Sequence, residues 1–137
     1  MSNRNRSVGH SWERDTVKLL REIFPNIATS RACNRLRDSQ KVDLVNADES
    51  VHGRLPYNFQ CKCLTGNVDL EKLLKELPVI PQITNVILHR KTKKIVTKSK
   101  KAIFKVTGEY VYMDFEAFVN ILRTLKTLQD EVNSYRC

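Results

Sequence analysis

The stretch LPYNFQCKCL, residues 55–64, decides the fold that we expect for this chain. Its aromatic and apolar residues alternate with polar ones, which predicts a core β-strand from about residue 57 to residue 64. Successive side chains of a strand point to opposite faces of a sheet, so Gln60 and Lys62 emerge together on one face. The opposite, core-facing set consists of Phe59, Cys61 and Cys63.

The segment KVDLVNADES at residues 41–50 contains a short apolar run followed by turn-forming residues. This pattern predicts a second strand, which carries Asp43 and ends in a turn. We expect the two strands to form a hairpin. Such a hairpin brings Asp43 towards Gln60 and Lys62.

Hydrophobic periodicity and the positions of proline and glycine predict the remaining elements. The order of all elements is α-β-β-β-α-β-β-α, which indicates an α/β domain with a central mixed sheet flanked by helices. Beside the two strands above, the expected elements are a helix over 10–24 with Ser11 as a possible N-cap, a short strand after Pro25 followed by an exposed basic loop, a helix over 68–77, strands over 84–91 and 102–113 joined by a basic turn over 91–101, and a long helix over 114–132 capped by Asp114.

Length and composition indicate one globular unit. The chain has 137 residues, of which 41% are hydrophobic, enough for a single buried core. Residues 1–9 are polar and basic and are expected to form a flexible arm, with the single domain over 10–137. The sequence contains neither the long apolar run of a membrane span nor the apolar region of a secretory signal, so we expect a soluble, cytoplasmic protein without membrane contact.

The charge of the chain favours a polyanionic partner. Lys and Arg number 24 against 15 Asp and Glu, a formal net charge of +9. Nucleic acid is the leading candidate, although a basic balance can also serve solubility alone. Two segments concentrate the charge: 31–37 holds three arginines, and 91–101 holds six lysines, a set that would otherwise be a solvated loop.

Four cysteines, Cys33, Cys61, Cys63 and Cys137, are expected to be reduced and to form no disulfide. A zinc site made of Cys33, Cys61, Cys63 and His52 is an alternative. A C-x-C pair without a second closely spaced pair is a weak zinc signature, and strand alternation already explains Cys61 and Cys63 as core residues.

Carboxylates that converge beside a lysine are suited to metal-dependent cleavage of a phosphodiester. V-D-L at 42–44 followed by F-Q-C-K-C at 59–63 resembles the signature of the PD-(D/E)XK nuclease superfamily, with Gln60 in place of the acidic residue. G-H-S-W-E-R-D at 9–15 resembles the opening helix of archaeal-type Holliday junction resolvases. S-R-A-C-N-R-L-R-D-S-Q at 30–40 is similar to the segment that precedes their catalytic aspartate.

The resemblance spans roughly residues 9 to 125 and implies a restriction-endonuclease-like fold with Glu13, Asp43, Gln60 and Lys62 in the active site. Asp43 would be the central metal ligand, and Glu13 would hold a metal ion or its water. Gln60 and the backbone carbonyl of Cys61 would add neutral oxygens, and Lys62 would stand beside the attacking water. Mg²⁺ is the expected metal, with Mn²⁺ as a substitute and no small-molecule cofactor.

These expectations describe a structure-selective DNA endonuclease, most specifically a Holliday junction resolvase that acts as a homodimer on four-way junctions. Three alternatives remain open: another nuclease of the superfamily that cuts flaps, ends or duplex, a non-catalytic DNA-binding relative because of Gln60, and a basic RNA- or ribosome-binding protein. The residues expected to contact DNA are Arg4, Arg6, Arg14, Arg31, Arg35, Arg37, Ser39, Lys93 and Lys94.

Overall fold

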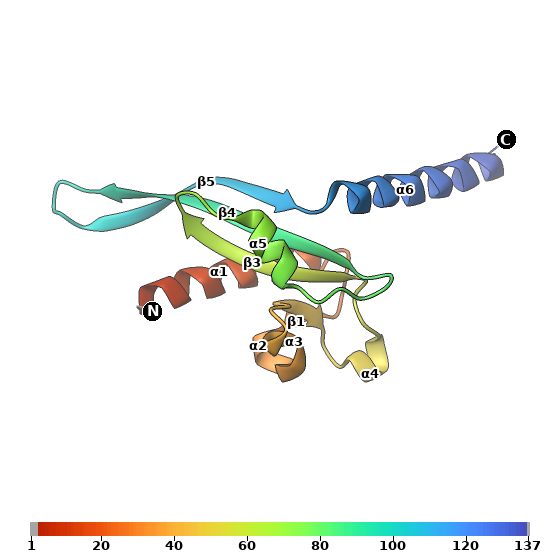
Figure 1. The fold of residues 1–137 in the computed structure, drawn as a ribbon, viewed down its shortest axis with the longest axis horizontal. Helices are drawn as coiled ribbons and strands as arrows, with labels where there is room; N and C mark the ends of the chain where they lie inside the picture. The colour runs from red at the N-terminus through yellow and green to blue at the C-terminus, as the bar shows by residue number, and fades with distance from the viewer. Residues whose placement is uncertain (1–2, 137) are drawn as a thin grey trace.

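The computed structural model describes the backbone of residues 3–136 and the side chains of residues 8–136. It has an α/β fold with a five-stranded mixed sheet in the order β1-β2-β3-β4-β5, flanked by helices (Figure 1). The elements are α1 (Asn3–Leu20), β1 (Ile27–Thr29), α2 (Ser30–Cys33), α3 (Arg35–Ser39), β2 (Leu44–Asn46), α4 (Glu49–His52), β3 (Tyr57–Thr65), α5 (Leu70–Glu76), β4 (Thr84–Val96), β5 (Ala102–Tyr112) and α6 (Phe115–Arg136).

The pairing of the strands leaves part of β3 uncovered. β3 pairs in parallel with β4 along its whole length, whereas β2 pairs with it, antiparallel, only at Leu44 and Phe59. The expected antiparallel contact between these two strands is therefore confirmed, with α4 inserted between them. Beyond Phe59 the edge of β3 is free of β2, and the candidate site lies at this edge.

Two apolar clusters cover the two faces of the sheet. On one face, Trp12 and Val17 of α1 pack against core residues that include Phe59 and Cys61. On the other face, α5 and Leu77 pack against Val42, Val45 and Ile87. The alternation expected for β3 is confirmed, because Phe59 and Cys61 face α1 while Gln60, one register step away, lies beside Ile87 in the other layer.

The first helix differs from expectation at both ends. α1 begins at Asn3 and not near Ser11, so residues 3–9, expected to form an arm, are helical. It ends at Leu20, and a turn covers residues 21–23. The start was missed because residues 3–9 contain hardly any apolar side chains, and hydrophobic periodicity was the main signal used.

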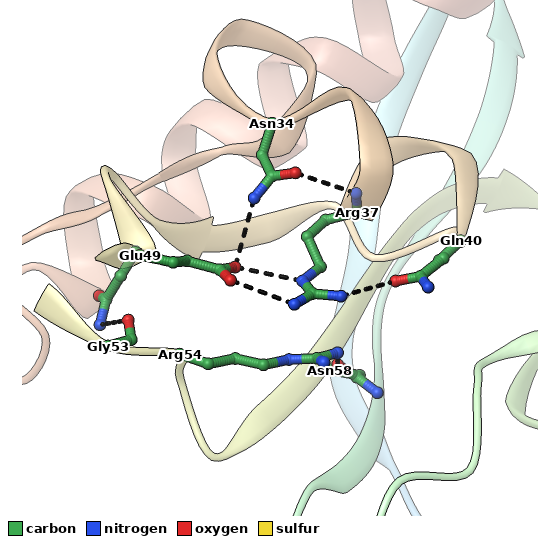
Figure 2. A network of polar contacts seen from close by, with 8 residues as sticks. Asn34, Arg37, Gln40, Glu49, Gly53, Arg54 and Asn58 are labelled. Atoms are coloured by element: carbon green, nitrogen blue, oxygen red, sulfur yellow. Dashed lines mark hydrogen bonds and ion pairs between the residues drawn. The ribbon is translucent and has the colours of Figure 1, made fainter. Parts of the chain in front are cut away.

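The segment expected to be an exposed basic loop instead forms two short helices, α2 and α3, and the turn after β2 contains α4. Arg37 joins these pieces: its guanidinium bonds Glu49 Oε1 and Oε2 at 3.2 Å each and Gln40 Oε1 at 3.0 Å (Figure 2). Asn34 accepts a hydrogen bond from the Arg37 backbone N–H. Side-chain contacts between distant residues, rather than periodicity, hold these helices.

β4 and β5 form a long antiparallel ribbon that extends past the rest of the sheet (Figure 1). The turn expected over 91–101 is much shorter, because residues 91–96 belong to β4 and only the stretch from Thr97 to Lys101 reverses the chain. Within this stretch Thr97 N–H donates to the carbonyl oxygen of Lys101 at 2.9 Å. The many lysines obscured a strand that cross-strand pairing stabilises.

α6 points away from the sheet at the opposite end from the ribbon (Figure 1). The expected helix after Asp114 is confirmed and is a few residues longer. None of its described residues is buried. Among residues 3–136, no helix is both long enough and apolar enough to cross a membrane.

Candidate active site

The structure brings together the four residues expected to form the active site. Glu13 of α1, Asp43, Gln60 and Lys62 line one open cleft of about 550 Å³. The cleft lies where β2 leaves β3, so the free edge of β3 forms its floor. Three separate parts of the sequence thus contribute to one cleft.

Asp43 is held by three hydrogen bonds. Its backbone N–H donates to the carbonyl oxygen of Phe59 at 2.7 Å, and its own carbonyl accepts from Ser30 N–H at 2.8 Å. Its carboxylate accepts the backbone N–H of Cys61 at 2.7 Å. We expected Asp43 inside a strand, but β2 begins one residue later, at Leu44. The hydrogen bond from Cys61 N–H holds the carboxylate at the edge of β3.

The surroundings of the Asp43 carboxyl group disfavour its ionised form. Burial raises its pKa from 3.8 to about 7, and the nearby negative charges of Glu13 and Asp38 add to this rise. The hydrogen bond from Cys61 N–H and the positive charge of Lys62 lower the pKa but do not compensate. A divalent cation beside Asp43 would offset the cost of ionising it.

Gln60 provides an independent sign of a ligand. Its side chain is only 2% exposed, and the carbonyl oxygen Oε1 has no hydrogen-bond partner among the described residues. An unpaired buried carbonyl costs on the order of 1–3 kcal/mol, so such an atom needs an explanation. An amide oxygen is a suitable ligand for a hard cation, and Gln60 lines the same cleft as Asp43. These residues therefore fit a magnesium-type ion.

Cys61 and Lys62 complete the set on β3. In an extended residue the N–H and C=O point to the same side of the strand, so the Cys61 carbonyl lies on the edge where its N–H meets Asp43. This position agrees with the expected role of that carbonyl as a ligand. Lys62 is partly exposed, and its charge acts on Asp43.

Glu13 reaches the cleft from α1 and is paired with Arg31. The Arg31 guanidinium lies 3.4 Å from Glu13 Oε2, and the Glu13 side chain is 15% exposed. Trp12 and Val17, in the core, fix the side of α1 that faces the sheet. Arg31 was expected to contact DNA, and its side chain is 41% exposed beside Glu13, which lines the cleft.

The zinc alternative finds no support in the arrangement of the ligands. Over the described part of the chain, no three His, Cys, Asp or Glu side chains are grouped so that they could hold a metal ion. Cys33, Cys61 and Cys63 are free thiols; Cys33 is exposed, whereas Cys61 is buried in the core that packs against α1. Cys137 lies outside the described residues.

The residues expected to contact DNA fall into separate groups. Arg14, Arg35 and Ser39 are exposed, as are Lys93 and Lys94 on the ribbon. Arg37 is different, because its guanidinium is already occupied by Glu49 and Gln40 and its side chain is only 16% exposed. The side chains of Arg4 and Arg6 lie outside the described part of the chain.

Sequence reasoning missed several residues that line the cleft. His10, Asp38, Lys41 and Phe104 all do so, and none of them was assigned to the site. Lys41 has a backbone φ of 68°, a left-handed conformation that is uncommon for lysine. Asp38 and Lys41 precede Asp43 by only a few residues, so their positions in the sequence could have indicated that they lie near it. Phe104 belongs to the ribbon, and its position in the sequence does not indicate that it lies near the cleft.

The structural role of Arg90 was also not predicted from the sequence. Its guanidinium lies 4.2 Å from the centre of the Trp12 ring and pairs with Asp15 at 2.9 Å and Glu109 at 3.3 Å. It ties α1 to β4 and β5. Trp12 also donates its indole N–H to the Leu88 carbonyl at 3.0 Å, so α1, which carries Glu13, is anchored firmly on the sheet.

Comparisons of this chain with protein-family models, with curated proteins and with solved structures find no match.

Proposed function

We propose that the protein is a metal-dependent DNA endonuclease of the PD-(D/E)XK type, most specifically a Holliday junction resolvase that works as a homodimer. The observation that carries the proposal is the convergence of Glu13, Asp43, Gln60 and Lys62 on one cleft. Two of its features call for a cation: the raised pKa of Asp43 and the unpaired Oε1 of Gln60. A restriction-endonuclease-like fold belongs to the same proposal.

In this proposal each side chain has a distinct task. Asp43, Glu13, Gln60 Oε1 and the Cys61 carbonyl hold a divalent cation, Mg²⁺ or Mn²⁺. Such an ion, when bound, polarises a water molecule and neutralises charge on the phosphate. Lys62 orients that water and stabilises the charge that develops on the phosphate oxygens. Arg31 pairs with Glu13 and, being 41% exposed, can also contact a phosphate.

The DNA is held mainly through its phosphates. Arg14, Arg35 and Ser39 are exposed and can contact it. The net charge of +9 supplies long-range attraction. Arg37 serves the fold instead, because it holds α3 against α4 beside the cleft.

The proposal of a homodimer rests on exposed apolar side chains along one side of α6. Exposed side chains at Phe118, Leu122, Leu125, Leu128 and Val132 recur at three- and four-residue spacing and form one stripe. A stripe of this kind exposed to water is costly, and a second copy offers an identical one to cover it. A two-fold arrangement would also present two clefts to opposed DNA strands.

The test is cleavage of a labelled four-way junction and of a linear duplex by the wild type and by Asp43→Asn. Each protein is incubated with Mg²⁺, with Mn²⁺ and with a chelator. The proposal expects paired, metal-dependent cuts in the junction that disappear in Asp43→Asn and persist in the control Asp130→Asn, which neutralises an exposed acid on α6. Cutting that continues in Asp43→Asn would overturn the site. If the linear duplex is cut as readily as the junction, the protein is a nuclease, but four-way junctions are not its preferred substrate.

A second candidate, a non-catalytic DNA-binding protein, is favoured by one observation: Gln60 stands where the superfamily signature has an acid. Gln60→Glu separates the two. A wild type that cuts DNA rejects the second candidate. A silent wild type that gains metal-dependent cleavage with Gln60→Glu supports it.

A further inference from the structure

The end of the β4–β5 ribbon extends past β3 and has an unusual charge pattern. β3 covers β4 only as far as Thr92, so from Lys93 to Lys105 the described chain consists of two strands alone. Four cross-strand pairs continue the ladder to the turn. The arm is nonetheless well formed, because Thr97 and Lys101 close the turn through hydrogen bonds of 2.9–3.2 Å.

The arm carries only positive charge. Between residues 91 and 105 the sequence has seven lysines and no acidic residue. Lys93 and Lys105 are directly opposite each other across the two strands. Like charges in this position repel and destabilise a ladder, and an anion placed between them removes the cost. These features suit a phosphate-bearing partner.

Beyond the paired lysines the same face becomes apolar. Ile95 is opposite Ile103, and they are 37% and 48% exposed. Side chains alternate along β4, so Ile95 and Lys93 share the face of His89, whose register partner on β3 is Lys62. One face of the sheet therefore carries the Ile95–Ile103 pair, the Lys93–Lys105 pair and Lys62, the proposed catalytic lysine.

We propose that this arm is a wedge for the branch point of DNA: Ile95 and Ile103 stack against the base pair exposed at the branch, and Lys93 and Lys105 bind the phosphates on either side. Apolar side chains that enter between base steps, flanked by cations, are a general means of holding unstacked DNA. A two-stranded ribbon has the width that the major groove admits. The inference rests on the proposed nuclease function and adds to it the element that selects branched over linear DNA.

The test uses the full chain in chelator, so that binding is measured without cleavage. The probes are a four-way junction with 2-aminopurine beside the branch and a linear duplex with the sequence of two arms. Ile95→Thr/Ile103→Thr removes the apolar pair and keeps β-branched residues in the strands. Lys93→Ala/Lys105→Ala removes the charges. Matched controls are Val79→Thr, an apolar residue that is 93% exposed, and Lys18→Ala/Lys126→Ala. Circular dichroism checks that each variant is folded.

The wild type is expected to raise 2-aminopurine fluorescence and to prefer the junction. The isoleucine double variant should lose the fluorescence change and about tenfold or more of junction affinity while binding duplex as before. The lysine double variant should weaken both complexes, and the slope of log affinity against log salt should fall by about 2. The two control variants should match the wild type.

An isoleucine double variant that keeps the fluorescence change and the junction preference overturns the wedge. Cleavage with Mg²⁺, measured on the same proteins, separates this failure from failure of the nuclease proposal. If cleavage depends on Asp43 but the isoleucines have no effect, the nuclease stands and the wedge falls. If no DNA is cut but the fluorescence change depends on the isoleucines, the wedge proposal is supported and the nuclease proposal fails.

Discussion

At the scale of single residues, Asp43 connects the stability of the protein with its proposed chemistry. Its carboxylate is buried beside Glu13 and Asp38, and burial is the main cause of the rise in its pKa to about 7. An ionised Asp43 therefore costs the folded protein free energy until a cation is bound. In our proposal, the same arrangement that disfavours ionisation of Asp43 becomes favourable when a divalent ion binds.

The first prediction is that the metal-free protein loses stability as the pH rises. The folded-state pKa of Asp43 lies above its unfolded value of 3.8, so the folded state binds more protons between about pH 4 and pH 7. The stabilisation is complete below pH 4 and is lost as the pH rises through 7. In chelator at pH 8, Asp43→Asn should be more stable than the wild type by roughly 2–4 kcal/mol. Urea unfolding at pH 5 and pH 8 measures this difference.

Magnesium supplies the control for this first prediction. It should stabilise the wild type more at pH 8 than at pH 5 and should leave Asp43→Asn almost unchanged, because binding requires the ionised carboxylate. An equal effect of pH on the two proteins would contradict the assigned environment of Asp43.

The second prediction concerns Lys62. Because we assign it to the developing charge on the phosphate and not to holding the DNA, Lys62→Ala should lower the single-turnover cleavage rate by about 100-fold or more with little change in the Kd for DNA. Lys126→Ala on α6 is the matched control. A loss of affinity that accounts for the whole loss of rate would show that Lys62 serves binding alone.

The convergence of Glu13, Asp43, Gln60 and Lys62 on one cleft could be predicted because their spacing resembles a known signature and alternation in β3 places Gln60 and Lys62 on one face. The burial of Gln60 and the rise in the pKa of Asp43 could not be predicted, because both depend on how α1 and the α2–α3 segment enclose the cleft. Phe104 was missed for a similar reason: it reaches the cleft through strand pairing far from the motif.

At the scale of elements, the segment from α2 to α4 acts as one unit that supports Asp43. Arg37 binds Glu49 through two nitrogens, and the Arg37 carbonyl accepts the N–H of Val42, next to Asp43, at 3.0 Å. The Ser30 N–H holds the Asp43 carbonyl from the other side. Short helices of four or five residues are unstable alone, so these contacts maintain them.

The third prediction follows from this unit. Both side chains of the Arg37–Glu49 pair are mostly buried, at 16% and 17% exposed, and removing one partner leaves the other unpaired. Arg37→Ala should lower the free energy of unfolding by roughly 2–3 kcal/mol, whereas the exposed neighbour substitution Arg35→Ala should have little effect on stability. Urea unfolding of both variants measures the difference. Equal, small effects would show that Arg37 does not hold the unit together.

The longer elements could be predicted from sequence because their apolar residues repeat with the period of a strand or a helix. β3, α5 and α6 are examples, since a strand or helix was expected in each place. The short helices lack such a repeat, and their stability comes from Arg37 and Glu49. The ends of β4 and β5 are rich in lysine, so only the pairing of one strand with the other shows that they are strands.

At the scale of the whole molecule, the ribbon and α6 extend in opposite directions from a small central sheet (Figure 1). Packing in the apolar core holds the sheet, α1 and α5 together, but the end of the ribbon and α6 extend beyond this core. In our proposal DNA meets the ribbon and a second copy covers α6. The sequence predicted the long C-terminal helix. It could not show whether the apolar side chains of this helix pack within the chain or between two chains, because both need the same pattern.

The fourth prediction is that α6 controls the oligomeric state. Leu125→Glu places a charge in the apolar stripe and should convert a dimer into a monomer, as measured by light scattering after gel filtration. Thr127→Glu, on the opposite side of the same helix, should leave the dimer intact. A wild-type monomer at all concentrations tested would contradict the homodimer.

The central claim is that Asp43 holds a divalent cation at the edge of β3, and Mn²⁺ binding measures it most directly. Electron paramagnetic resonance at pH 8 reports free Mn²⁺ during titration of the wild type, of Asp43→Asn and of the control Asp130→Asn. We predict saturable binding in the wild type and in Asp130→Asn and its loss in Asp43→Asn. Binding that is equally strong in Asp43→Asn, or absent from the wild type, would contradict the claim.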